Sequence, residues 1–199
     1  MRCSASVLIG VLSLTLLTAG GRSGIAQTIN REQEIKVAYL YQFAKYVEWP
    51  KNAVPDDDQF FVIGVLGKDP FGGHLDRLAE TKTVQDRKIV LRRFDSAKDY
   101  QPCHILFISA LPVPTSEEKT ADQRLKAAVE KTKGTPVLLV GDTPGFAEKG
   151  VVINFLVDAQ ENRIKLEINR DAERRAGLKI SAQLLALERS GVVRILKAD

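Results

Sequence analysis

Four short apolar runs separated by helix-forming segments are the feature of this sequence that most restricts its fold. The runs cover residues 60–67, 88–94, 104–109 and 137–141. The first is nearly continuous and is bounded by turn residues, which is typical of a strand buried on both faces. Helical patterns lie between the strands, one from Asp69 as cap to about Glu80 and one from Ser116 to Lys131. Alternating strands and helices predict βαβ units and a mainly parallel sheet.

The pattern changes after Gly150. Two β-rich segments, 151–157 and 163–168, are separated by a short polar stretch, which favours an antiparallel hairpin. Asn169 is placed to cap a short helix that Gly177 ends. Ser181 is placed to begin a last helix, which is predicted to carry Leu184, Leu185 and Leu187 and to continue past Gly191 with Val193 and Ile195. We therefore expect a single α/β domain: a mostly parallel sheet flanked by helices, with a C-terminal β-hairpin and helices.

A helix is predicted over residues 31–49, closed by Pro50. Apolar side chains occupy two sides of this helix, so we expect it to be covered on both sides, either by its own domain or by a second chain. Trp49 lies at the end of the helix. It is interpreted as a residue packed on the core, with an exposed anchor for a partner as the alternative.

The N-terminus has the three-part order of a secretory signal peptide. An early cation, Arg2, precedes an apolar run over residues 7–17, and small residues lead to Ala26. The run is about half the length of a membrane span, which needs roughly 20 residues, so a retained anchor is not expected. We predict a signal peptide over residues 1–26, with cleavage after Gly20 or Ala19 as the alternative, and a domain over residues 27–199 that works outside the cytoplasm.

Composition restricts the partners and the redox chemistry. Without the predicted signal peptide the chain carries 27 basic and 25 acidic residues and no dense basic stretch, so nucleic acid is not an expected partner. One cysteine, Cys103, then remains, and no internal disulfide is possible. Cys103 is expected to be a buried, inert thiol, because the adjacent His104 would point to the opposite face of a strand and could not act as its base.

No motif predicts a cofactor, a metal or catalysis. The turn Gly141–Gly145 is similar to the Asp-x-x-Gly turn of GTP-binding proteins, but the sequence has no phosphate-binding loop to accompany it, so a plain tight turn is expected. The two histidines, His74 and His104, are placed in different predicted elements, and a shared metal site is not expected. These observations favour a non-enzymatic protein without a cofactor.

Several segments in register resemble the YfiR family of periplasmic proteins over nearly the whole mature chain. They are residues 37–50, 104–109, 145–150 with 153–155, 166–169 and 175–181. The resemblance implies a periplasmic regulator, dimeric in the family, that binds the outer domain of an inner-membrane diguanylate cyclase and represses it. Such a protein links the state of the envelope to cyclic-di-GMP, adhesion and biofilm.

The resemblance also implies positions for disulfides that this chain lacks. One family bridge maps onto Cys103 and Gly64, and a second maps onto Ala147 and Asn154. Redox sensing by internal disulfides is therefore not expected to carry over, whereas repression of a cyclase is.

For the partner-binding surface, the resemblance points to the hairpin glutamate, Glu167, and to Ile153 on the preceding strand. Alternation along the second hairpin strand predicts that Glu167 is exposed. Two other functions stay open: a periplasmic small-molecule sensing module coupled to a histidine kinase, and an enzyme with an unfamiliar site.

Overall fold

The computed structural model describes residues 22–51, 53, 59–158, 160–161 and 163–196, with side chains described from Arg31 onward. Residues 1–21, which make up most of the predicted signal peptide, lie outside the described residues. The prediction of cleavage therefore stays a prediction.

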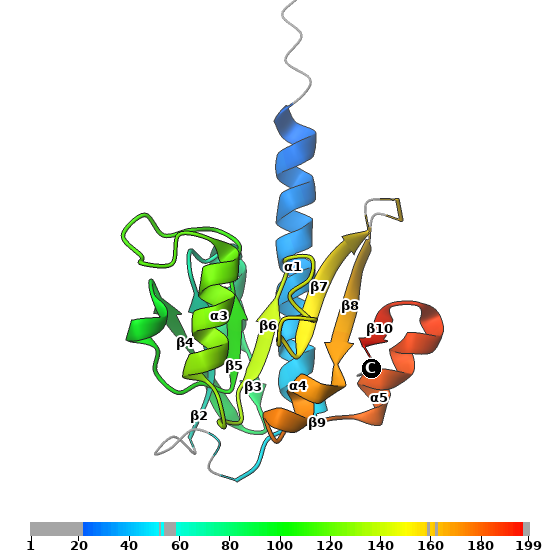
Figure 1. The fold of residues 1–199 in the computed structure, drawn as a ribbon. Coiled ribbons are helices and arrows are strands. Elements are labelled where there is room, and N and C mark those ends of the chain that lie inside the picture. The colour runs from blue at the N-terminus through cyan, green and yellow to red at the C-terminus, as the bar shows by residue number, and fades with distance from the viewer. Residues whose placement is uncertain (1–21, 52, 54–58, 159, 162, 197–199) are drawn as a thin grey trace, which may run out of the picture.

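A twisted sheet forms the centre of the domain, as Figure 1 shows, and within the described residues it has eight strands in the order β10-β8-β7-β6-β5-β2-β4-β3. The strands are β2 (Phe60–Leu66), β3 (Thr83–Val84), β4 (Arg87–Phe94), β5 (Ile105–Ile108), β6 (Leu138–Gly141), β7 (Ile153–Asp158), β8 (Arg163–Asn169) and β10 (Val193–Leu196). The five strands from β7 to β4 are parallel, and β8 pairs antiparallel with β7. The predicted mostly parallel α/β fold with a C-terminal hairpin is confirmed.

Helices cover both faces of the sheet and bury two apolar clusters. Helices α1 (Arg22–Tyr46) and α2 (Gly73–Thr81) contribute to the larger cluster, and α3 (Ala121–Lys131) with the 3-10 helix η1 (Ala97–Asp99) contributes to the smaller one on the other face. Short helices α4 (Arg170–Arg175) and α5 (Ala182–Leu185), followed by η2 (Ala186–Ser190), close the C-terminal end. A parallel sheet buried on both faces explains why its strands are continuous apolar runs.

Two helix starts differ from the prediction. Asp69 does not cap α2, which begins at Gly73; its carboxylate accepts a hydrogen bond from the Phe71 backbone at 2.7 Å and pairs with Arg93. Helix α3 begins at Ala121 rather than near Ser116, because Thr120 and Gln123 form a reciprocal capping box. The start of α3 is thus set by a side-chain cap, whereas α2 begins after Gly72, which has φ of 56° and forms no side-chain capping bond.

The last predicted helix is wrong beyond Ser190. Ser181 caps α5 as expected, but Gly191 has φ of 70° and ends the helical segment, and the residues after it form strand β10. Strand β10 pairs parallel with β8, so that Val193 lies beside Leu166 and Arg194 beside Glu167. The apolar spacing of this short segment is compatible with a helix or a strand. It forms a strand because it pairs with the edge of β8.

The expected coverage of α1 comes from the domain itself. Val37, Leu40, Phe43 and Ala44 are buried, and Phe43 stacks on Phe155 of the hairpin with ring centroids 5.6 Å apart. The helix ends at Tyr46 rather than at Trp49, because Val47–Glu48 forms a two-residue strand, β1, that pairs with β9 (Lys179–Ile180). The first turns of α1 extend beyond the sheet (Figure 1).

Trp49 packs on the core as predicted. Its ring lies edge-on to Phe61 at a centroid distance of 5.3 Å, and its Nε1–H donates to the carbonyl oxygen of His104 at 3.1 Å. An indole placed in this way buries its apolar ring and still satisfies its donor.

Gly64 lies in the middle of β2, directly beside Cys103. A Cβ atom at Gly64 would be 3.1 Å from the Cys103 Sγ and 3.0 Å from atoms of Leu106 and Phe94. In a disulfide, the Cβ of one cysteine is about 3 Å from the sulfur of the other. The geometry therefore suits a bridge between these two positions, in agreement with the mapping that the family resemblance implies.

We predict that Gly64→Cys forms a disulfide with Cys103 under oxidising conditions. The bridge should raise the free energy of unfolding by about 2–4 kcal/mol relative to the reduced variant, because it closes a long loop in the unfolded chain. Thiol titration of the denatured protein and denaturant unfolding with and without reductant measure both effects. The double variant Gly64→Cys/Cys103→Ser is the control. Two free thiols in the oxidised single variant would contradict the prediction.

Candidate functional site

Glu167, the residue that the sequence placed on the binding surface, is buried. Only 1% of it is exposed, whereas its neighbours on the same face of β8 follow the predicted alternation, with Lys165 partly exposed and Arg163 exposed. The expectation of an exposed Glu167 is therefore wrong. A carboxylate removed from water must be paired and hydrogen-bonded to persist.

Two neighbouring strands supply those partners. Asn154 of β7 lies opposite Glu167 and donates from Nδ2 to its Oε2 at 3.0 Å. Arg194 of β10 lies opposite Glu167 on the other side and forms an ion pair with it. Asn154 also donates to the carbonyl oxygen of Thr143 at 3.0 Å, which ties the β6–β7 connection to the same row.

Part of this row reaches the surface. The Arg194 side chain is 61% exposed and also faces Glu148 at 3.6 Å, with Glu148 itself exposed. The buried Glu167 carboxylate thus holds one end of a guanidinium whose remainder is available at the surface. We name Asn154, Glu167, Arg194 and Glu148 the hairpin polar row.

Ile153, the second predicted site residue, belongs to the apolar core. It is fully buried in the cluster under α1, and its register partner on β8 is Ile168. Ile153 lies on β7 and Glu167 on β8, and their side chains point to opposite faces of the sheet. The structure thus places both residues in the predicted hairpin, and neither offers a side chain to solvent.

Arg194 and Asn154 are the members that sequence reasoning missed. The side chain of Glu167 is covered because β10 extends the sheet beyond β8, and the sequence had assigned that segment to a helix. The available signal was the β-branched pattern from Val192 to Ile195 after Gly191, which is typical of a strand.

A buried cation was also missed. Arg124 of α3 is fully buried and donates to the carbonyl oxygens of Ser109, Glu118 and Ala110 at 2.8–3.0 Å. A guanidinium can satisfy several carbonyls at once because its donors form a planar fork. Arg124 thereby fixes the loop that follows β5.

Cys103 and His104 point to opposite faces of the sheet, as predicted. Cys103 is buried in the smaller cluster, and burial raises the pKa of its thiol to about 12. The His104 ring stacks on Phe61 in the larger cluster, and its Nδ1 accepts from the Val62 backbone at 3.0 Å. Burial, together with the positive charges of Arg87 and Arg92, lowers the pKa of His104 to about 4. The thiol is protonated and the imidazole neutral at pH 7, with no contact that would couple them as a nucleophile and its base.

The turn after β6 is a plain tight turn, as expected. Gly145 has φ of 82°, and the Phe146 backbone donates to Thr143 at 3.2 Å. Among the described residues, no group of three histidine, cysteine or acidic side chains is arranged to hold a metal ion.

The family profile described as YfiR/HmsC-like matches residues 33–189, which extend from α1 to η2. The chain belongs to the YfiR/HmsC-like family. The match includes β7 and β8 and all but Arg194 of the hairpin polar row. A search of curated proteins finds no significant match to this YfiR-like chain.

Solved structures show only distant similarity to this YfiR-like protein. One is a conserved domain protein from Vibrio cholerae, with a TM-score of 0.45, 14% identity, 83% of this chain covered and 60% of that one. Another is an ABC domain in complex with L-Trp from Streptococcus pneumonia, with a TM-score of 0.45, 9% identity, 69% of this chain covered and 56% of that one. The chain thus spans less than two thirds of either structure. In the part of the chain that the structure describes, no helix combines the length and apolarity that a membrane span requires.

We predict that Glu167→Lys destabilises the domain by about 3–5 kcal/mol, because it places an unpaired ammonium against Asn154 and Arg194 inside the protein. Glu117→Lys, at a carboxylate whose side chain is 73% exposed, should change stability by less than about 1 kcal/mol. Denaturant unfolding of both variants measures the difference. Equal stability of Glu167→Lys and wild type would show that the hairpin polar row is not structural.

We also predict a stability loss in mild acid that depends on His104. Its pKa is about 4 in the folded state against 6.5 in the unfolded state, so the unfolded chain binds the proton more tightly. The contribution is complete above pH 6.5 and is lost as the pH falls toward 4, and it amounts to about 3 kcal/mol. Unfolding free energies from pH 7 to pH 4 should fall less steeply for His104→Gln than for wild type. Parallel pH profiles would refute the assignment.

Proposed function

We propose that the mature protein is a non-enzymatic periplasmic regulator, exported by a cleaved signal peptide, that binds the outer domain of an inner-membrane diguanylate cyclase and represses it. The observation that carries this proposal is the family match over residues 33–189, because the YfiR/HmsC-like family is regulatory and associated with cyclic-di-GMP signalling. In keeping with the family, the active form is a homodimer.

The contact surface in this proposal is the exposed side of the hairpin polar row. Glu167 and Ile153 act from beneath this surface: Glu167 orients Arg194, and Ile153 packs the hairpin on α1. Arg194 and Glu148 carry opposite charges at the surface, and Val157 of the same hairpin is 54% exposed. A guanidinium held at one end by a buried carboxylate loses little side-chain entropy on binding, which favours its use at an interface.

The proposal predicts that loss of the protein raises cellular cyclic-di-GMP and that the tagged mature chain captures a membrane protein with a cyclase domain. Glu148→Lys should keep the wild-type unfolding transition, since the pair with Arg194 is exposed, and should weaken capture by placing like charges against the partner. Nucleotide extraction and quantitative pull-down from solubilised inner membranes measure these effects.

Glu117→Lys is the matched control, because it reverses an exposed glutamate that pairs with Lys98, away from the hairpin. It should capture the partner as well as wild type. Capture that is unchanged by Glu148→Lys would move the contact surface elsewhere. Unchanged cyclic-di-GMP after deletion of the gene would refute repression of a cyclase.

A further inference from the structure

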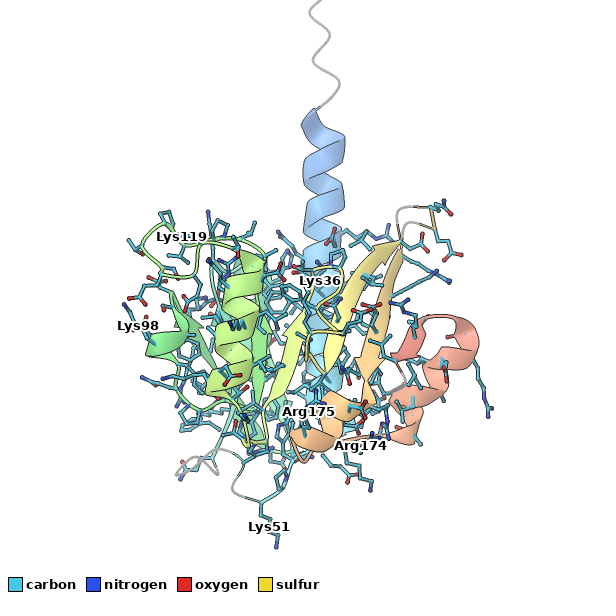
Figure 2. All side chains as sticks on the ribbon, viewed as in Figure 1. Lys36, Lys51, Lys98, Lys119, Arg174 and Arg175 are labelled. Atoms are coloured by element: carbon cyan, nitrogen blue, oxygen red, sulfur yellow. The ribbon has the colours of Figure 1, made fainter. Side chains whose placement is uncertain are left out.

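A cavity lies where α1 passes the carboxyl ends of the central strands. It has a volume of about 230 Å³, and its wall includes Glu32 and Lys36 of α1, Pro70 after β2, Leu111 after β5 and Asp142 after β6. Figure 2 shows Lys36 at this level, just below the part of α1 that extends beyond the sheet. Three segments far apart in sequence and one helix therefore meet here.

The position of the cavity follows from the order of the strands. From β2 the chain continues to β4 on one side of β2 and then crosses to β5 on the other side. The chain runs from β2 toward β4 and from β5 toward β6, which lie in opposite directions along the sheet. The loops after β2 and β5 therefore separate, and a crevice forms between them beyond the strand ends. In open parallel sheets, ligands bind at such switch points.

The wall of the cavity is fixed in place by hydrogen bonds. Arg124 donates hydrogen bonds to the carbonyl oxygens of Ser109 and Ala110. Ser109 donates from Oγ to the carbonyl oxygen of Lys68 at 2.7 Å and accepts from the Leu111 backbone at 3.1 Å. The loops after β2 and β5 are thus joined to each other before any ligand arrives, and a preformed wall reduces the ordering cost of binding.

The charged side chains that line the cavity are Glu32, Lys36 and Asp142. Lys36 forms ion pairs with Glu32 at 2.6 Å and with Asp142 at 2.9 Å. Burial alone would lower the pKa of Lys36, but the two carboxylates outweigh burial and raise the pKa, so the ammonium stays charged. The lining side chains therefore comprise one cation and two anions, while the Arg124 guanidinium behind the wall binds carbonyl oxygens.

One acceptor oxygen at this site has no donor. The Oδ1 of Asp142 is buried and has no hydrogen-bond partner among the described atoms, while its Oδ2 accepts from Lys36. An unsatisfied buried acceptor destabilises the folded state. The terminal torsion of an aspartate is soft, so a modest rotation presents this oxygen to the cavity that Asp142 lines.

The rest of the wall is mixed: Gln33 and Ser109 are polar, and the other side chains are apolar. Among the apolar ones, Pro70 is partly exposed and Leu111 is 44% exposed. The volume is below the range typical of drug-sized ligands. We propose that this cavity binds a small organic ammonium ion with an aliphatic group, the ammonium against Asp142 and Glu32 and the aliphatic group against Pro70 and Leu111.

This inference stands without the proposed repression of a cyclase, because it concerns the isolated protein. Two of the named lining residues belong to α1 at the point where that helix leaves the sheet. An occupant would therefore bridge α1 and the strand-end loops.

Titration of the mature protein with isopentylammonium, followed by amide chemical shifts in NMR, tests the proposal. We expect saturable shifts confined to residues 32–36, 68–71, 109–111 and 142, with a dissociation constant in the millimolar range. Isovalerate, which replaces the ammonium by a carboxylate, and isopentanol, which removes the charge, should bind at least about tenfold more weakly, the equivalent of about 1.4 kcal/mol. Equal binding of either compound, or no saturable shift, would overturn the proposal.

Two variants with matched controls locate the site. Asp142→Asn should weaken isopentylammonium about tenfold, whereas Asp122→Asn, at an exposed carboxylate on α3, should not. Leu111→Lys places a cation at the cavity without disturbing the core and should also abolish binding. Leu187→Lys, at a leucine of η2 that is 37% exposed, should leave binding unchanged. If Asp142→Asn fails to fold, the leucine pair still decides the question. Unchanged affinity in Leu111→Lys would refute the site.

Discussion

The whole domain depends on burying the central strands on both faces. Strands β2, β5 and β6 have almost no exposed side chain, and each needs a covering layer on either side. Helices α1 and α2 provide one layer, and α3 with the β6–β7 connection provides the other. With the predicted signal peptide removed, Cys103 has no second cysteine to pair with, so the native state depends on this packing without a covalent crosslink.

The same burial explains how the domain treats its polar groups. Glu167, Arg124 and Lys36 are each removed from water, and each is held by partners from several elements: Asn154 and Arg194 for Glu167, three carbonyls for Arg124, and Glu32 and Asp142 for Lys36. In a low-dielectric interior such groups persist only when they are paired, and each pairing ties separate segments together. Glu167 connects three strands, and Arg124 connects a helix to a strand-end loop.

The two proposals concern two separate regions of the domain, the hairpin polar row and the cavity. The hairpin polar row involves β7, β8 and β10, and the cavity lies in the middle of the sheet, at the carboxyl ends of β2, β5 and β6 and beside α1. Helix α1 packs on the hairpin strands through Phe43 against Phe155, on the face of the sheet opposite the hairpin polar row, and it lines the cavity through Lys36 against Asp142. A partner at the hairpin and a ligand at the cavity would therefore both bind to segments that α1 covers.

The sequence by itself determined the fold class, the positions of strands β2, β4, β5, β6, β7 and β8, the hairpin, the Asn169 cap and the opposite orientations of Cys103 and His104. These features follow from local periodicity, capping chemistry and the pleat of a strand. It also determined the family, through segments in register along the chain. Only the tertiary structure decided that residues 193–196 form a strand, because the secondary structure of so short an apolar segment depends on whether it pairs with a strand edge, here that of β8. That strand, with Asn154, covers Glu167, which alternation had placed in solvent. The cavity likewise could not be predicted, because its wall comes from segments that are joined only by the order of the strands and by Arg124, whose three acceptors lie outside its own helix.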